Sequence, residues 1–230
     1  MNEELKKKNK EELEEEKEEI YIERNVKLKK YRLYKNKNDI NWHFVYYISV
    51  ILNKFVNKIK LKRGEHCIYL RNVEDLEKVI NFLKNNVNCQ FKLLMDICGI
   101  DYLGKQKINK KRFEVNYNLL SIKYNLRIQL KVSVDEFTSI SSIKTFYKAA
   151  DWYEREVWDM YGLFFKNHKD LRRILTDYGF EGFPLRKDFP QSGYVELRYN
   201  NDYKHLVYEP VELSQAFRYF DFISPWNIKI

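Results

Sequence analysis

The amino-acid sequence predicts an α+β fold in two layers, with helices on a mixed or antiparallel sheet, followed by a long extended C-terminal tail. Three observations support this class. Apolar and polar residues alternate in two neighbouring segments, 113–119 and 126–134, as in an antiparallel hairpin with one buried face. Three other segments carry apolar residues at helical spacing. All four prolines lie after residue 162, where neither pattern continues.

The first thirty residues predict a charged arm. Segment 1–30 holds nine basic and ten acidic residues, and pairs such as Glu3–Lys7 stand four positions apart, which stabilises a solvated helix. Its few apolar residues are too sparse to form a stripe. We therefore expect a flexible arm, and the alternative is a helix that joins a coiled coil.

A basic stretch follows the arm. Residues 31–71 hold nine basic and two acidic residues and account for +7 of the net charge of +9. Apolar residues at helical spacing predict a helix over about 42–58, whose basic C-terminal end suits the negative end of the helix dipole. The stretch is either a core helix with a basic end or a surface for nucleic acid or lipid.

The patterns that follow place the elements of the sheet. We expect a short strand at 67–70, a helix over about 74–86 and a buried strand over 91–100. The alternating hairpin comes next. Its apolar phase slips between Leu119 and Leu120, which predicts a β-bulge in the first strand.

A last helix completes the predicted domain. Asn125 marks the tight turn that joins the two strands of the hairpin. A helix is then expected over about 143–161, and Gly162, which follows it, is a typical C-cap residue. The order is helix, strand, helix, three strands and helix, which is ferredoxin-like in character. We expect this α+β domain to span residues 31–162.

The remaining segment, 163–230, has a different composition. It is rich in proline, glycine and aromatic residues, and it is too long for an ordinary loop yet too apolar for a disordered tail. Its aromatic side chains must be buried either on the domain or on another protein. We expect an extended C-terminal segment that lies across a large partner.

Few residues suggest catalysis or cofactor binding. The three cysteines and four histidines are scattered without metal-ligand spacing, and no glycine-rich phosphate loop is present in the sequence. The odd number of cysteines argues against a secreted disulfide scaffold. The longest apolar stretch, residues 44–52, is shorter than the roughly 20 residues of a membrane helix. We expect any redox chemistry to belong to another chain.

The densest charged cluster lies on the last predicted helix. Glu154, Arg155, Glu156 and Asp159 come close together there, and Arg155 can pair with Asp159 four positions on. Two carboxylates beside an arginine can form an acid–base site. The alternative is a salt-bridged helix face with a structural or interfacial role.

A second cluster occurs in the tail. Arg172 and Arg173 are followed by Arg186 and Asp188, with Phe189 next to them. Opposite charges alternate here between apolar residues, which suits ion pairs in a protein interface more than a track of phosphate contacts.

The motifs of the second half closely resemble a known family, the thirty-kilodalton subunit of respiratory complex I, which includes subunit nine of the mitochondrial NADH dehydrogenase and its counterpart in the bacterial NADH-quinone oxidoreductase. The resemblance extends over about residues 40–226 and departs from the family pattern at Lys169, at Phe183 and in the arm. It rests on His168 and on the segments 96–101, 154–162, 170–180, 184–190 and 209–213.

The resemblance implies a non-catalytic structural subunit in the peripheral arm of the proton-pumping NADH:ubiquinone oxidoreductase. Such a subunit packs against the forty-nine-kilodalton subunit at the quinone site and binds no cofactor. NADH, FMN, iron–sulfur clusters and ubiquinone are handled by other subunits. It would bind no nucleic acid and would reach the membrane only through the complex.

We expect the chain on the matrix side of the mitochondrial inner membrane, and its mitochondrial origin rests on the composition, not on the motifs. Abundant Lys, Asn, Ile and Tyr, all with A/T-rich codons, favour a chain encoded by the organelle itself. We expect the partner interface to include Glu154, Arg155, Glu156, Asp159, Arg172, Arg173, Arg186, Asp188, Phe189, Glu209 and Glu212.

Two other functions remain open at this point. An RNA-binding protein of an organellar ribosome would use the basic stretch and the many aromatic residues for stacking, and its binding would weaken steeply with salt. A small acid–base enzyme centred on Glu154, Glu156 and Asp159 would need a pocket with a carboxyl group of raised pKa.

Overall fold

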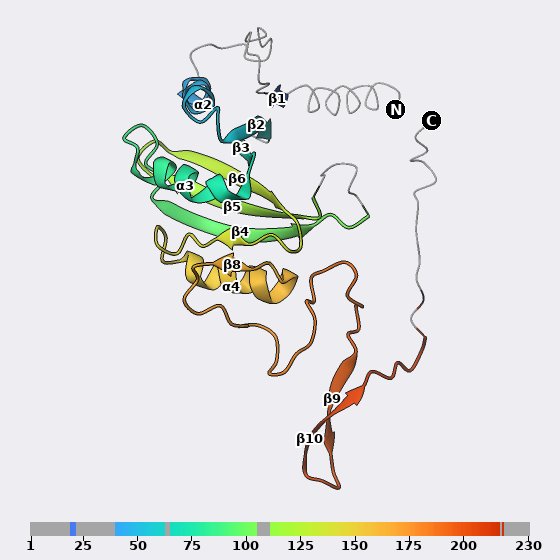
Figure 1. The fold of residues 1–230 in the computed structure, drawn as a ribbon. Coiled ribbons are helices and arrows are strands. Elements are labelled where there is room, and N and C mark those ends of the chain that lie inside the picture. Colours follow the sequence, from blue (N-terminus) through green and yellow to red (C-terminus); the bar gives the residue numbers. More distant parts are fainter. Residues whose placement is uncertain (1–18, 22–39, 63–64, 105–110, 217, 219–230) are drawn as a thin grey trace, which may run out of the picture. The chain divides into compact units, whose positions relative to one another are not determined.

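The computed structural model describes residues 19–21, 40–62, 65–104, 111–216 and 218. The chain divides into two compact units, Met1–Asp188 and Phe189–Ile230, called unit 1 and unit 2 below. Unit 1 contains a six-stranded sheet with the order β1-β2-β3-β6-β5-β4 (Figure 1). Its strands are β1 (Glu19–Tyr21), β2 (Val56–Lys62), β3 (Glu65–Leu70), β4 (Leu93–Asp101), β5 (Phe113–Ser121) and β6 (Leu126–Val134).

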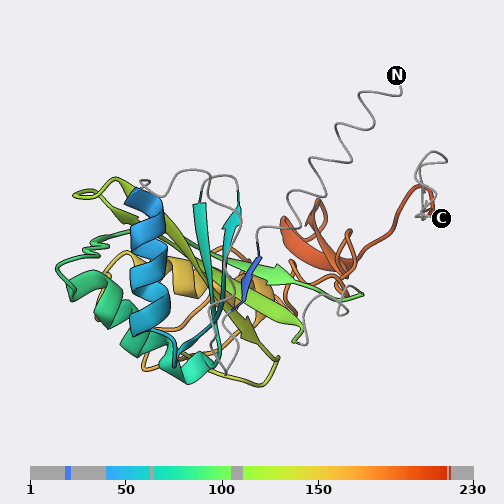
Figure 2. The same ribbon diagram turned by 90° about the horizontal axis from the view of Figure 1, so that it is seen from above.

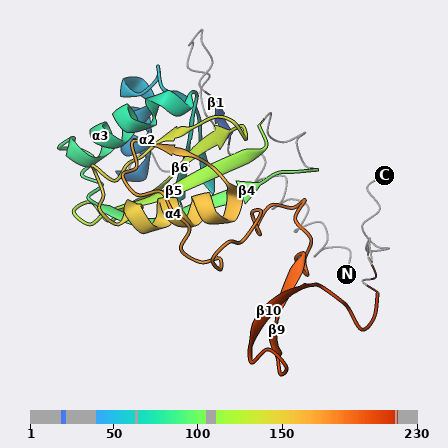
Figure 3. The ribbon, with the colours of Figure 1, turned by 60° about the horizontal axis from the view of Figure 1, so that its bottom comes forward.

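The sheet is mixed, because β3 and β6 run parallel while the other neighbouring strands are antiparallel. The helices α2 and α3 lie next to each other (Figure 2), and α4 lies along β4 (Figure 3). The predicted α+β class is therefore confirmed. The helical elements are α2 (Ile40–Ile51), η1 (Val73–Asp75), α3 (Leu76–Asn85) and α4 (Ala150–Tyr161).

The core forms on one face of the sheet, where the alternating apolar residues of adjacent strands meet. Paired residues share a face, so Tyr117 lies with Leu130, and Val115 lies with Gly99. A Cβ atom at Gly99 would stand 2.7 Å from the ring of Tyr161, which ends α4. The glycine therefore allows α4 to pack closely against the apolar face.

The first predicted helix was too long. The expected helix over 42–58 ends at Ile51, and a strand that the sequence did not predict, β2, begins at Val56. The register between β2 and β3 shifts between Val56 and Lys58, so the apolar residues of β2 do not alternate strictly. This irregularity made the beginning of the strand look like a continuing helix.

The predicted bulge lies in a different strand. The register irregularity is between Leu94 and Asp96 in β4, opposite Leu119 and Asn118, while β5 pairs with β6 without a shift up to Ser121. The change of apolar phase in β5 is thus matched by an extra residue in the neighbouring strand β4.

The last predicted helix was also too long. Of the expected span 143–161, only α4 (Ala150–Tyr161) is helical, and turns precede it. Its C-cap is confirmed: Gly162 has φ 73°, and its N–H donates to the carbonyl of Trp158.

The predicted arm 1–30 lies mostly outside the described residues. Within it, β1 pairs with β2, joining Ile20 to Ile59 in antiparallel register. The sequence did not predict this strand, because a three-residue strand gives no readable alternation.

The boundary of the predicted tail differs from that of the structure. The sequence placed it at 162/163, but residues 163–188, called the strap below, belong to unit 1. Leu163 and Phe165 are almost fully buried, and the short strands β7 (Ile140–Ser141) and β8 (Phe165–Lys166) pair in parallel. The strap's aromatic residues are thus partly covered by this chain's own domain.

Unit 2 contains a hairpin that the sequence did not predict. Its strands, β9 (Val195–Asn200) and β10 (His205–Pro210), pair in antiparallel register. The signal was present, since apolar and polar residues alternate through β9. The surrounding prolines and glycines obscured it.

Candidate partner interface

The carboxylate of Asp159 fixes the strap to α4. It is fully buried, and its Oδ2 accepts the backbone N–H groups of Ile174, Leu175 and Thr176 at 3.2, 2.8 and 3.0 Å. Arg173 approaches its Oδ1 at 3.3 Å. Burial alone would raise the pKa of Asp159, but these hydrogen bonds, with one from the Thr176 hydroxyl, hold it below its usual value.

The carboxyl group of Glu154 fixes the turn before α4. Its two oxygens accept the hydroxyl proton of Ser142 at 2.6 Å and the N–H of Ile143 at 2.7 Å. The side chain is fully buried, and burial raises its pKa to about 7. Glu154 thereby satisfies the backbone N–H of Ile143, the first residue of the span that was predicted to be helical.

His168 connects the strap to the first turn of α4. Its buried ring lies with Nε2 at 3.0 Å from Oδ1 of Asp151, and its Nδ1 accepts the N–H of Asp170 at 3.2 Å. These partners assign the proton of a neutral ring to Nε2. Asp151 also pairs with Lys144 at 2.7 Å. Two segments on either side of α4 therefore meet at this carboxylate.

Arg155 does not form the predicted pair with Asp159. Its Nε donates to the carbonyl of Arg172 at 3.1 Å, and its guanidinium lies 5.4 Å from the ring centre of Trp152. The carboxylate of Asp159 instead accepts hydrogen bonds from backbone N–H groups of the strap. Glu156 points outward and is exposed.

The second predicted cluster is divided between the surface and the interior. Arg172 is largely exposed and pairs with Asp170 at 3.1 Å. Arg186 is mostly buried, and its Nε donates to the carbonyl of Tyr161 at 2.7 Å. Its guanidinium also lies 4.6 Å from the ring centre of Phe183. The sequence could not distinguish these two arginines.

The last predicted interface residues lie in unit 2 or at its border. Asp188 ends unit 1, and Phe189 begins unit 2 with its ring 5.4 Å from that of Tyr194. Glu209 accepts both ends of the Arg198 guanidinium, at 2.6 and 2.7 Å. Glu212 is exposed. An interface role for any of the eleven residues stays a prediction, and the buried ones use their polar groups within the chain.

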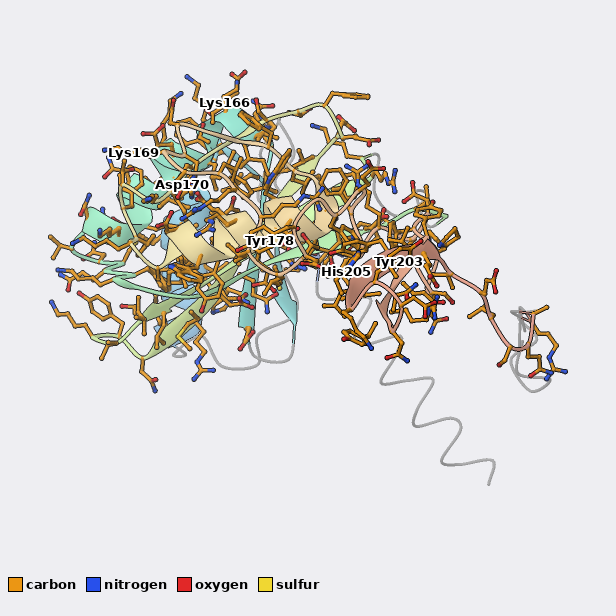
Figure 4. The ribbon with its side chains drawn as sticks, turned by 90° about the horizontal axis from the view of Figure 1, so that it is seen from below. Lys166, Lys169, Asp170, Tyr178, Tyr203 and His205 are labelled. Carbon is orange, nitrogen blue, oxygen red and sulfur yellow. The ribbon has the colours of Figure 1, made fainter. Side chains whose placement is uncertain are left out.

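Sequence reasoning missed the exposed apolar side chains around α4. They share one feature, which is that each belongs to α4 or to the strap. Three charged residues of the strap, Lys166, Lys169 and Asp170, are also exposed (Figure 4). The apolar and aromatic residues, with their exposed fractions, are Trp152 (65%), Phe164 (52%), Leu175 (61%), Tyr178 (98%) and Leu185 (52%).

The hairpin of unit 2 has two different faces. Paired residues share a face, and the pairs Leu197–Tyr208 and Tyr199–Leu206 lie on one face together with Val195 and Pro210. The other face carries Arg198 and Glu209. Each of the apolar side chains is about half exposed, with fractions of 55% for Val195, 49% for Leu197, 50% for Tyr199, 58% for Leu206 and 58% for Tyr208.

The profile of one protein family matches residues 71–195, more than half of the chain. Its description is the 30-kilodalton subunit of the respiratory-chain NADH dehydrogenase. The chain belongs to this family. It is therefore a subunit of respiratory complex I, as the motifs of the second half had indicated, and these comparisons give the RNA-binding alternative no support.

Individual relatives agree with this assignment. NADH dehydrogenase [ubiquinone] iron-sulfur protein 3 of Beta trigyna is 52% identical over 82% of this chain and 96% of its own length. NADH-ubiquinone oxidoreductase subunit 9 of Reclinomonas americana is 50% identical over 76% of this chain and 83% of its own length. Among solved structures, a trypsin-resistant fragment of Nqo5 matches with a TM-score of 0.50 and 25% identity, over 57% of this chain and all of that one.

Proposed function

We propose that this chain is a non-catalytic structural subunit in the peripheral arm of a proton-pumping NADH:ubiquinone oxidoreductase. Its task is to hold the forty-nine-kilodalton subunit that forms the quinone site. The observation that carries this proposal is the exposed apolar face of the β9–β10 hairpin. A two-stranded hairpin is marginally stable by itself in water, and an apolar face of this kind is typical of a protein–protein contact.

The two surfaces suit different parts of such a contact. The hairpin offers an apolar face of five large side chains, which can be buried against a groove in a partner. The surface around α4 offers Trp152 and Leu175 beside exposed charged residues, which resembles an apolar centre with a polar rim. Their combined use would explain why one subunit needs both units.

The absence of a cofactor is also part of the proposal. Iron–sulfur clusters are held by four cysteine thiolates, whereas this chain has three cysteines, and two of them, Cys67 and Cys89, are buried. Within the described residues, no group of three or more His, Cys, Asp or Glu side chains is arranged to hold a metal ion. NADH, FMN, the clusters and ubiquinone would then be bound by other subunits.

The proposed location is the matrix side of the mitochondrial inner membrane. None of the helices in the described part of the chain is long and apolar enough to cross a bilayer. In this proposal, the chain reaches the membrane only through the assembled complex. The composition that favours A/T-rich codons supports synthesis inside the organelle.

A binding experiment with matched variants tests the proposed partner. The full chain would be co-expressed with the forty-nine-kilodalton subunit and recovered through a tag. Leu197→Glu places a charge on the apolar face of the hairpin, and Val207→Glu places the same charge on its polar face. We expect at least tenfold less partner with Leu197→Glu and little change with Val207→Glu, because only the first buries a charge in the contact. Equal recovery with both variants would refute this use of the hairpin.

A further inference from the structure

Five ionised residues meet at one end of the sheet, where unit 1 ends. They come from four segments: the end of β4, the residue before β5, the loop after β6 and the end of the strap. This group is called the root clamp below. Its members are Asp101, Arg112, Glu136, Arg186 and Asp188.

The centre of the root clamp is a two-pronged ion pair. Nε and one terminal nitrogen of Arg112 donate to the two oxygens of Asp101 at 3.1 and 3.0 Å. The Asp101 side chain is 1% exposed and that of Arg112 is 15% exposed. A planar guanidinium bound in this way has a fixed orientation, so it can hold a third group in a defined place.

The third group is the chain that leaves unit 1. Arg112 binds Asp188 at 2.9 Å, and the backbone N–H of Lys187 donates to Oδ2 of Asp101 at 3.0 Å. The preceding residue is held as well, because Arg186 pairs with Glu136 and donates to the carbonyl of Tyr161. Three consecutive residues, 186–188, are thus bound to the sheet end immediately before unit 2 begins.

We infer that Arg112 is a positioning residue, whose function is to fix the point from which unit 2 leaves the domain. The inference rests on the proposed function, in which the hairpin of unit 2 binds a partner. A segment that is already fixed loses less conformational freedom when it docks. The root clamp would therefore favour binding without touching the partner.

Hydrogen exchange of the full chain, measured without any partner, tests this inference directly. In Arg112→Gln we expect the amide of Lys187 to exchange at least tenfold faster. Asp101, which accepts the hydrogen bond of this amide, would lose the guanidinium that orients its carboxylate. Amides in β5 and β6 should keep their rates. Asp101 is buried, so this variant risks a general loss of folding.

A milder variant keeps the test decisive. Asp188→Asn leaves the Asp101–Arg112 pair intact, and its side chain is half exposed, so the fold should be preserved. We expect exchange of the Lys187 amide to rise about two- to fivefold, as for the loss of a partly exposed ion pair. The control is Asp135→Asn, which removes the neighbouring Lys111–Asp135 pair and should leave the exchange of the Lys187 amide unchanged.

The outcomes separate the inference from the proposed function. Unchanged exchange at Lys187 in Asp188→Asn, or equal acceleration throughout β5 and β6, would overturn a role for the root clamp and leave partner binding intact. Normal partner recovery with Leu197→Glu would overturn the proposed hairpin contact and leave the exchange result valid. Exchange that rises at Lys187 without a rise in β5 and β6 supports the root clamp.

Discussion

At the scale of single residues, the carboxyl group of Glu154 has the most informative environment. It is fully buried beside Ser142 and the backbone of Ile143, and its pKa is about 7 instead of the usual 4.5. The folded chain therefore binds this proton more strongly than the unfolded chain does. Glu154 is thus a packing feature of the domain, unlike Glu156, which is exposed on the same helix.

This environment predicts a pH dependence of folding stability. Because the pKa is raised in the folded state, the contribution of Glu154 is fully present below about pH 4.5 and is lost as the pH rises through about 7. The loss amounts to about 3 kcal/mol. Urea unfolding between pH 5 and 8 should show the free energy of unfolding falling, and Glu154→Gln should flatten this slope. An equal slope in the variant would contradict the assignment.

Asp159 should be more sensitive to substitution than its neighbour on the same helix. Replacing it by alanine leaves three backbone N–H groups of the strap without their acceptor, which should cost about 3–5 kcal/mol. The control Glu156→Ala alters an exposed side chain and should change stability by less than about 0.5 kcal/mol. Denaturant midpoints of the two variants measure this difference, and similar midpoints would argue against the anchoring role.

At the scale of elements, the junction between α4 and the strap depends on a glycine. Gly162 has a positive φ, and a Cβ atom there would stand 2.6 Å from both Arg186 and Phe183. Gly179 has a similar φ of 71° but nothing within 4 Å of such an atom. A substitution at Gly179 would therefore test backbone strain alone, whereas one at Gly162 would add a steric conflict.

Alanine at these two glycines should have unequal effects. Gly179→Ala should cost about 1 kcal/mol, from the left-handed backbone alone. Gly162→Ala should cost about 2–4 kcal/mol, because it also displaces the guanidinium of Arg186 and the ring of Phe183. Thermal unfolding of both variants would show this order, and equal shifts would mean that the contact with Arg186 is unimportant.

The sequence predicted elements well where a single periodicity ran without interruption. Strand β6 and the C-cap Gly162 are as expected, because strict alternation and a glycine after a helix are local signals. The prediction from sequence was wrong where a local signal was interrupted, because the irregular start of β2 was taken for a continuing helix. The turn before α4 was taken for helix as well, since its stability comes from the distant carboxyl group of Glu154.

The candidate site was predicted less well than the fold. The cluster on α4 was found from its charges, but the partners of Asp159 and Arg186 lie 14 to 50 positions away in the sequence and could not be deduced from spacing. The amphipathic hairpin had a readable alternation in β9, yet its exposed apolar face is visible only once the pairing with β10 is known.

At the scale of the whole molecule, the chain consists of a domain with its own core and a second unit whose apolar surface is uncovered. Shortening the chain after Asp188 should therefore leave unit 1 folded, with a cooperative unfolding transition, but abolish recovery of the partner subunit. Circular dichroism and the co-expression assay would measure the two effects. Loss of the transition itself would show that the units are not independent.

We propose that this chain is held in complex I through unit 2. The most direct test is cross-linking mass spectrometry on the native-gel band that carries NADH dehydrogenase activity. We expect the chain to be present in this band, and we expect Lys204, in the turn between β9 and β10, to be cross-linked to the forty-nine-kilodalton subunit. Absence of the chain from the band would contradict its place in the complex. Cross-links from Lys204 exclusively to other subunits would contradict the proposed partner.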